Sequence, residues 1–191
     1  MKKYLKKKAH QKRQCEEILC AGFGGQGIMF MGKLLAEAAL YDGKNVTWMP
    51  SYGAEVRGGT AHSMIKISDD YIANPVVMRP SICVAMNYPS LVKYENQVSE
   101  GGLLIANKSL IEKGPKRKDI DMLTLPLTDI ASRLGNVKAA NMVALGVLVK
   151  RRRAVSRSSL LEALKETMKN KEDLLALNKK AFEAGYGMVR S

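Results

Sequence analysis

Two glycine-rich segments hold the residue types that could do chemistry in this chain of 191 residues. The first, residues 22–27 (GFGGQG), has the GxGxxG spacing and lies between a short apolar run and an apolar-rich helical pattern. In such a turn the backbone approaches a ligand closely, and the first amides of the following helix suit a phosphate. We expect Gly22 to permit the tight turn, Gly24 to let the backbone approach a ligand, and Gly27 to let the helix pack on the strand.

The acidic residue that would complete a dinucleotide site is missing. A carboxylate about 20 residues after the glycine turn would bind the ribose, but residues 44–52 contain no acid and Glu55 comes late. Three interpretations therefore stay open: a dinucleotide site, a purely architectural turn, and a contact to a phosphate or a partner protein. The last would use the amides of the turn formed by Gly22, Gly24, Gly25 and Gly27.

The second glycine-rich segment is residues 51–59 (SYGAEVRGG), which places Glu55 and Arg57 in a flexible frame. One interpretation is a surface turn with a solvated ion pair, which would contribute about 0–1 kcal/mol. The other is a ligand-facing or partner-facing loop, because such loops at strand ends bind ligands in open α/β sheets. Tyr52 and Arg57 are also typical interface anchors.

The elements that must position these segments alternate along the chain. Apolar runs predict strands at 17–21, 46–49, 60–68, 81–86, 103–106 and 122–125. Helical patterns fall at 28–40, 90–98, 129–134, 139–149, 159–168 and 173–184. We expect a capping box of Ser159 with Glu162, a C-terminal stop at Gly185, and a core or interface position for 139–149. The alternation predicts a three-layer, Rossmann-like α/β domain with a mostly parallel sheet, in which 60–68 could be antiparallel.

The net charge of +13 is concentrated at the beginning of the chain. Residues 1–15 carry seven basic residues and no acid, and the remainder carries 24 basic against 18 acidic residues. We expect a solvated, mobile basic arm at 1–15 and one α/β domain at 16–191. The arm alone would support a nucleic-acid-binding protein, but no recognition motif follows it. The chain shows neither a membrane span nor a secretory signal, so we expect a cytoplasmic protein.

Cysteine and histidine usage argues against a self-sufficient catalytic or metal site. The three cysteines show no CxxC spacing, which predicts no disulfide framework and no cluster or zinc site built by this chain alone. Cys20 and Cys83 lie in apolar runs and are predicted to be small core residues. His10 lies in the arm, and His62 is expected to be packed or hydrogen-bonded. We find no nucleophile–base pair.

Together, the two glycine segments resemble the gamma subunit of the 2-oxoacid:ferredoxin oxidoreductases, the family of the pyruvate, 2-oxoglutarate, 2-ketoisovalerate and indolepyruvate enzymes. Further agreement lies in Pro80 with the strand that follows it, in 140–146 (ANMVALG), and in 178–186 with its AFEAG core. The resemblance covers about residues 16–187, and the basic arm departs from it.

The resemblance implies one part of a larger enzyme. Such complexes decarboxylate a 2-oxoacid on thiamine diphosphate, pass electrons through iron–sulfur clusters to ferredoxin, and trap the acyl group on coenzyme A. The cofactors belong to alpha, beta and, where present, a ferredoxin-like delta subunit, while gamma docks on alpha near the coenzyme A approach. The isolated chain is then expected to be inactive, to hold no cofactor of its own, and to be able to form a homodimer.

On this resemblance, we assign the turn of Gly22, Gly24, Gly25 and Gly27 to a phosphate or partner contact, and the loop of Tyr52, Glu55 and Arg57 to the alpha subunit or coenzyme A. As the 2-oxoacid, 2-oxoglutarate or a branched-chain acid is favoured over pyruvate. Two alternatives remain: a stand-alone dinucleotide-binding oxidoreductase and a nucleic-acid-binding protein using the arm.

Overall fold

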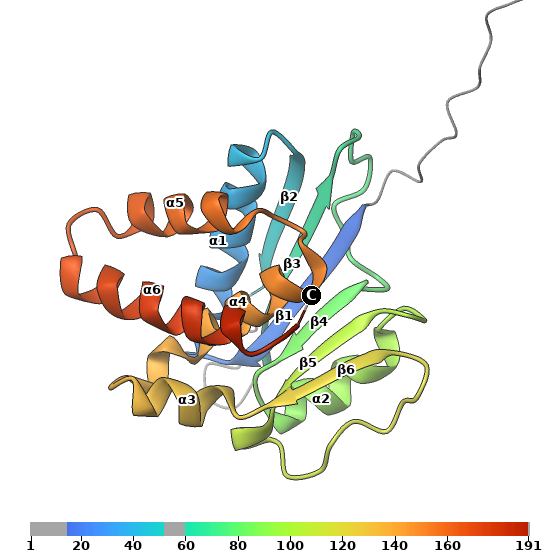
Figure 1. Ribbon diagram of the computed structural model, residues 1–191. Coiled ribbons are helices and arrows are strands. Elements are labelled where there is room, and N and C mark those ends of the chain that lie inside the picture. The colour runs from blue at the N-terminus through green and yellow to red at the C-terminus, as the bar shows by residue number, and fades with distance from the viewer. Residues whose placement is uncertain (1–14, 52–59, 191) are drawn as a thin grey trace, which may run out of the picture.

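One six-stranded sheet with helices on both faces organises the chain (Figure 1), in the strand order β2-β3-β1-β4-β5-β6. The computed structural model describes residues 15–51 and 60–190. Its strands are β1 (Glu16–Phe23), β2 (Asn45–Ser51), β3 (Thr60–Ser68), β4 (Ile82–Ala85), β5 (Leu103–Asn107) and β6 (Asp121–Leu125). Its α-helices are α1 (Ile28–Tyr41), α2 (Tyr88–Tyr94), α3 (Leu127–Arg133), α4 (Ala140–Arg152), α5 (Arg157–Thr167) and α6 (Glu172–Gly187). Short 3₁₀ turns are η1 (Glu95–Gln97), η2 (Lys108–Leu110) and η3 (Val137–Ala139).

The sheet is parallel except for β3, which pairs antiparallel with β1 and with β2. β1, β4, β5 and β6 pair in parallel. β2 therefore runs in the direction of β1, and the connection through α1 crosses over β3. This confirms the predicted mostly parallel sheet and the antiparallel strand at 60–68.

Alternating side chains of the strands supply two separate cores, as a three-layer fold requires. In β1, Ile18 and Cys20 belong to the core under α1 and α4, whereas Leu19 and Ala21 belong to the core under α2. Figure 1 shows α1 and α3 to α6 on one side of the sheet and α2 on the other.

The two cysteines of the sheet interior are inert by position. Cys20 and Cys83 are fully buried, on neighbouring strands but in cores on opposite faces of the sheet. Burial raises the pKa of the Cys20 thiol to about 12, and it raises the pKa of Cys83 as well. Both thiols therefore stay protonated at neutral pH. Their burial confirms the prediction that they are small core residues. Cys15 is exposed.

Helices α4 and α6 approach each other closely through glycine. A Cβ at Gly185 would lie 1.9 Å from the Val143 carbonyl oxygen, and one at Gly146 would lie 2.1 Å from that of Phe182. The prediction that Gly185 ends the last helix is wrong, because α6 continues to Gly187 and Gly185 serves the contact. Residues 140–149 are all buried, so α4 is a core helix. Within 15–51 and 60–190, none of the helices combines the length and apolar character needed to cross a membrane.

Helix α5 begins at Arg157, two residues before its predicted start at 159, and its N-cap lies three residues before the predicted cap Ser159. Ser156 is the N-cap, and its Oγ accepts the Ser159 N–H at 3.0 Å. Ser159 instead donates its hydroxyl to Asp42, which also accepts the Ser156 N–H at 2.6 Å. The predicted capping box of Ser159 with Glu162 is therefore wrong, because a carboxylate from the end of α1 takes its place.

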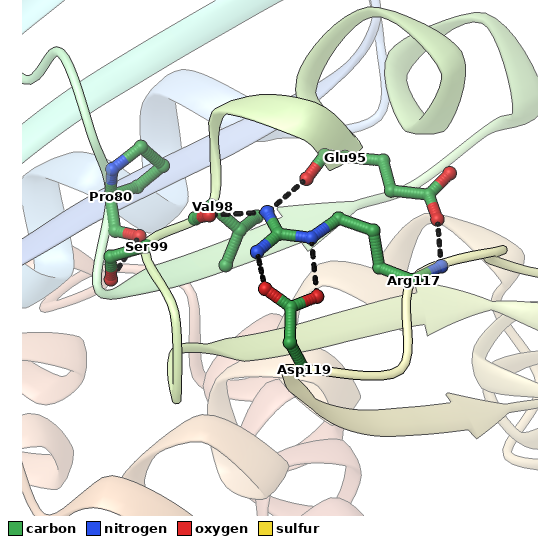
Figure 2. Close-up of polar contacts among 6 residues, drawn as sticks. All are labelled: Pro80, Glu95, Val98, Ser99, Arg117 and Asp119. Atoms are coloured by element: carbon green, nitrogen blue, oxygen red, sulfur yellow. Dashed lines mark hydrogen bonds and ion pairs between the residues drawn. The ribbon is translucent and has the colours of Figure 1, made fainter.

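The long connection between β5 and β6 is held by Arg117 and Glu95 (Figure 2). The Arg117 guanidinium binds the Asp119 carboxylate and donates to the carbonyl oxygens of Glu95 and Val98, at the beginning and the end of the turn η1 that follows α2. Glu95 Oε1 accepts the Arg117 N–H at 2.9 Å. The hydrogen bond from Arg117 lowers the pKa of Asp119.

We predict that Gly185→Ala destabilises the protein by about 3 kcal/mol, because the added methyl group separates two packed helices. Gly187→Ala changes the last residue of the same helix, two residues further on, where the added methyl group meets open space. It should leave stability unchanged or raise it by about 0.5–1 kcal/mol. Urea unfolding of both variants checks this, and equal stabilities would contradict the role of Gly185.

A pH dependence follows from the Arg117–Asp119 pair. Because the pKa of Asp119 is lower in the folded protein, the pair stabilises the connection above the ordinary carboxyl pKa. This contribution disappears as the pH falls through the lowered pKa. In Arg117→Gln the pKa of Asp119, measured by carboxyl NMR titration, should rise toward its ordinary value. The exposed Arg133→Gln serves as control, and an Asp119 pKa that Arg117→Gln leaves unchanged would refute the assignment.

Candidate functional site

The glycine turn lies at the topological switch point of the sheet, where successive connections lead to opposite sides. β1 continues through α1 to β2 on one side, whereas β4 continues through α2 to β5 on the other. The carboxyl ends of β1 and β4 therefore border a crevice of the kind in which open α/β sheets bind ligands. The structure places residues 22–27 beside this crevice.

Gly25 and Gly27 give the turn its shape. Their φ angles are 88° and 72°, in the left-handed region that favours glycine. Gly27 is also the N-cap of α1, and a Cβ there would lie 2.1 Å from Asn141 Nδ2 at the beginning of α4. The close approach at Gly27 is thus to α4. Gly24 is exposed with nothing within 4 Å of a Cβ, so its backbone is open to a ligand or partner.

Gly22 does not form the tight turn that the spacing suggested, because it is still part of β1. A Cβ at Gly22 would lie 2.6 Å from Gln26 Oε1 and 2.8 Å from a methyl carbon of Ile28. Glycine is required at this position because the side chains that follow the turn fold back over the strand.

Gln26 organises the inside of the turn, a role that the sequence analysis missed. Its Oε1 accepts the Phe23 N–H at 2.7 Å and an N–H of the Asn87 carboxamide at 3.1 Å. Its Nε2 donates to the Met86 carbonyl oxygen at 3.4 Å. One side chain therefore links the glycine turn to the end of β4.

Two buried asparagines extend this link along the carboxyl edge of the sheet. Asn87 is the N-cap of α2 and accepts the Ser90 N–H at 2.9 Å. Asn107 at the end of β5 donates to the Met86 carbonyl oxygen at 3.1 Å and to Thr128 Oγ1 at 2.8 Å. The capping role of Asn87 could have been found from the proline two residues later, whereas nothing in the sequence signals the role of Asn107.

Among the residues that the structure describes, two hollows lie beside the turn and share Gly25 and Lys138. One, of about 190 Å³, is bordered by Gln26, Met86 and Val137 among others. The other, of about 240 Å³, lies between α1, α4 and α6 and is lined by Gly27, Phe30, Met168, Leu174, Leu177 and the buried amides of Asn141 and Asn178. Both are smaller than the usual 300–1,000 Å³ of a ligand pocket, so each suits one chemical group of a ligand or one side chain of a partner.

The second predicted segment, with Tyr52, Glu55 and Arg57, lies outside the described residues. Thr60, the first residue of β3, pairs with Phe23 at the end of β1. β3 therefore begins beside the glycine turn. His62 packs its ring against Tyr94, with 5.8 Å between ring centroids, as expected of a packed histidine.

Residues 17–188 match the family model described as pyruvate ferredoxin/flavodoxin oxidoreductase. The chain belongs to this family. Its match extends over nearly the whole described structure, so the family resemblance of the glycine segments is confirmed.

Individual relatives agree with the family. The chain is 37% identical over 180 residues to the 2-oxoglutarate synthase subunit KorC of Methanocaldococcus jannaschii, covering 92% of this chain and 94% of KorC. It is 36% identical over 174 residues to the ketoisovalerate oxidoreductase subunit VorA of Methanothermobacter thermautotrophicus, covering 91% of this chain but 36% of VorA. The chain thus spans about a third of that relative.

A solved structure extends the comparison to the fold. The gamma subunit of a keto/oxoacid ferredoxin oxidoreductase from Geobacter sulfurreducens superposes with a TM-score of 0.79 at 32% identity, covering 90% of this chain and 96% of that one. These matches support the gamma-subunit interpretation and give no support to a stand-alone dinucleotide enzyme or a nucleic-acid-binding protein.

We predict that Gly27→Ala destabilises the protein by about 2 kcal/mol, because alanine strains the left-handed backbone and collides with Asn141. Gly24→Ala, three residues away in open space, should change stability by less than about 0.5 kcal/mol. Asn141→Ala added to Gly27→Ala should restore part of the loss by removing the collision. Thermal unfolding of the three variants measures this, and a Gly27→Ala variant as stable as Gly24→Ala would disprove it.

Proposed function

We propose that this chain is the gamma subunit of a 2-oxoacid:ferredoxin oxidoreductase that converts a 2-oxoacid to its acyl-coenzyme A and reduces ferredoxin. The observation that carries the proposal is the match to KorC over nearly the full length of both chains. The fold shared with the Geobacter gamma subunit supports it at the level of structure.

In this proposal the chain serves as a docking part of the complex. Around the glycine turn the side chains that line the two hollows are carboxamides, apolar groups, the Thr128 hydroxyl, which accepts a hydrogen bond from Asn107, and Lys138. Such groups bind and orient, whereas acyl transfer would need an activated nucleophile. Thiamine diphosphate and the iron–sulfur clusters would belong to the alpha and beta subunits and a ferredoxin-like delta subunit, and the complex would act in the cytoplasm.

The carboxyl edge of the sheet is the surface that we assign to the alpha subunit. Large apolar side chains are exposed around the crevice: Phe23 at 37%, Tyr88 at 38%, Leu110 at 43% and Val137 at 54%. Phe23 is the last residue of β1, Tyr88 and Leu110 follow β4 and β5, and Val137 precedes α4, so these side chains surround the glycine turn. An apolar surface of this kind around polar groups is typical of a protein interface.

Coenzyme A would approach the same edge. Gly24 and Gly25 are exposed, and Lys138 supplies a positive charge beside both hollows. These groups suit a phosphate, and Arg57 in the neighbouring loop would add a second cation. For the acyl donor we favour 2-oxoglutarate or a branched-chain 2-oxoacid, the substrates named for KorC and VorA.

The proposal is tested by co-expressing this chain with alpha and beta subunits of the same complex and measuring acyl-coenzyme A formation. Arg57→Ala should lower turnover at subsaturating coenzyme A by about tenfold, the loss expected from one charged hydrogen bond, or prevent assembly. Arg79→Ala is the matched control, because it changes an exposed arginine that precedes the amino-terminal end of β4.

The outcomes of this experiment distinguish a role toward coenzyme A from a contact between subunits. Reduced turnover with intact assembly would support a role toward coenzyme A, and loss of assembly would support a subunit contact. Normal assembly and turnover with Arg57→Ala would remove the role of the loop. Failure of the unaltered chain to join any such complex would refute the proposed function itself.

A further inference from the structure

The hydrogen-bond ladder between β1 and β4 ends with an unusual rung. The Met86 N–H donates to the Ala21 carbonyl oxygen at 2.8 Å, which is the last regular rung of this parallel pair. In a regular ladder the next hydrogen bond would run from the Phe23 N–H to the Met86 carbonyl oxygen. The Gln26 carboxamide stands between these two groups instead, accepting from Phe23 and donating to Met86.

The Gln26 side chain therefore acts as an inserted peptide group. A carboxamide has one acceptor oxygen and a donor nitrogen, as a peptide unit does, so it can satisfy both strand ends after they move apart. Its neighbours are adapted to it. Gly22 lacks the Cβ that would collide with Oε1, and the almost fully buried Asn87 donates to the same oxygen while it caps α2.

The Gln26 carboxamide occupies the place where a dinucleotide would bind. In a dinucleotide site of this topology, the pyrophosphate enters the crevice beside the glycine turn and accepts from the backbone amides there. Here the Phe23 N–H donates to Gln26, and the hollow that Gln26 helps to line measures about 190 Å³. That volume is below the lower end of the range for ordinary ligand pockets.

We propose that Gln26 is a specificity-determining residue that fills the crevice between β1 and β4 with the protein's own carboxamide and thereby excludes dinucleotides. Ligands and partners then meet the outer surface of the turn at Gly24 and Gly25. The inference concerns the shape of the turn and does not rest on the proposed function.

Amide hydrogen exchange of the full chain, followed by NMR with and without millimolar NAD⁺, tests the proposal. In the unaltered chain, NAD⁺ should leave exchange in residues 22–28 unchanged. Gln26→Ala should raise exchange at Phe23 by about tenfold or more, because its acceptor is lost. In this variant NAD⁺ should slow exchange in the turn again by entering the opened crevice. Gln97→Ala, which removes an exposed carboxamide that donates to the Lys93 carbonyl oxygen, is the matched control and should behave as the unaltered chain.

Gln26→Glu is the second variant, and it guards against a failure of Gln26→Ala to fold. The glutamate can still accept from Phe23 and Asn87, so Phe23 should stay protected and NAD⁺ should still have no effect. The proposal is overturned if NAD⁺ slows amide exchange in the unaltered turn, or if Gln26→Ala leaves the exchange rate of Phe23 unchanged. It is also overturned if NAD⁺ does not slow exchange in the turn of Gln26→Ala, or if Gln26→Glu loses the protection of the Phe23 amide.

Discussion

The site depends on one constraint: the polar backbone groups at the ends of β1 and β4 must find partners after the strands move apart. Buried groups left without hydrogen bonds cost about 1–3 kcal/mol each. Side-chain carboxamides meet this need, with Gln26 between the two strand ends and Asn107 sharing the Met86 carbonyl oxygen. Because Asn87 bonds to Gln26 and caps α2, the same network fixes the start of the next helix. The glycine turn is thus held in shape before any ligand or partner arrives.

Helix packing fixes the glycine turn from its other side. Gly146 and Gly185 let α4 and α6 lie in backbone contact, which fixes α4 within the core. Asn141, near the beginning of α4, then lies against Gly27 and donates to its carbonyl oxygen at 3.4 Å. The position of the first helix is therefore coupled to helices more than 100 residues later in the chain. A change in the α4–α6 contact would reach the site through Asn141.

Local patterns predicted the elements well because apolar alternation and helical periodicity report directly on burial. The strand at 60–68 was predicted at its observed bounds, and the helix from Ile28 was placed to within one residue at its end. The errors occur where a distant segment decides the structure. Gly185 has the residue type of a helix stop, but α4 requires it within α6. Ser159 has the spacing of a capping box, but Asp42 competes for its hydroxyl. Gly22 has the spacing of a turn residue, but Gln26 folds over it.

The same reasoning explains why a GxGxxG turn can occur without the acid that binds a ribose. In this chain the demand for glycine at Gly22 and Gly27 comes from the side chains of Gln26 and Asn141, not from a bound pyrophosphate. The spacing records how closely a strand, a turn and a helix pack, and this packing is compatible with more than one use. What distinguishes the uses is the surface around the turn. Here exposed apolar side chains surround small hollows and one lysine, and such a surface favours a protein partner over a deeply enclosed nucleotide.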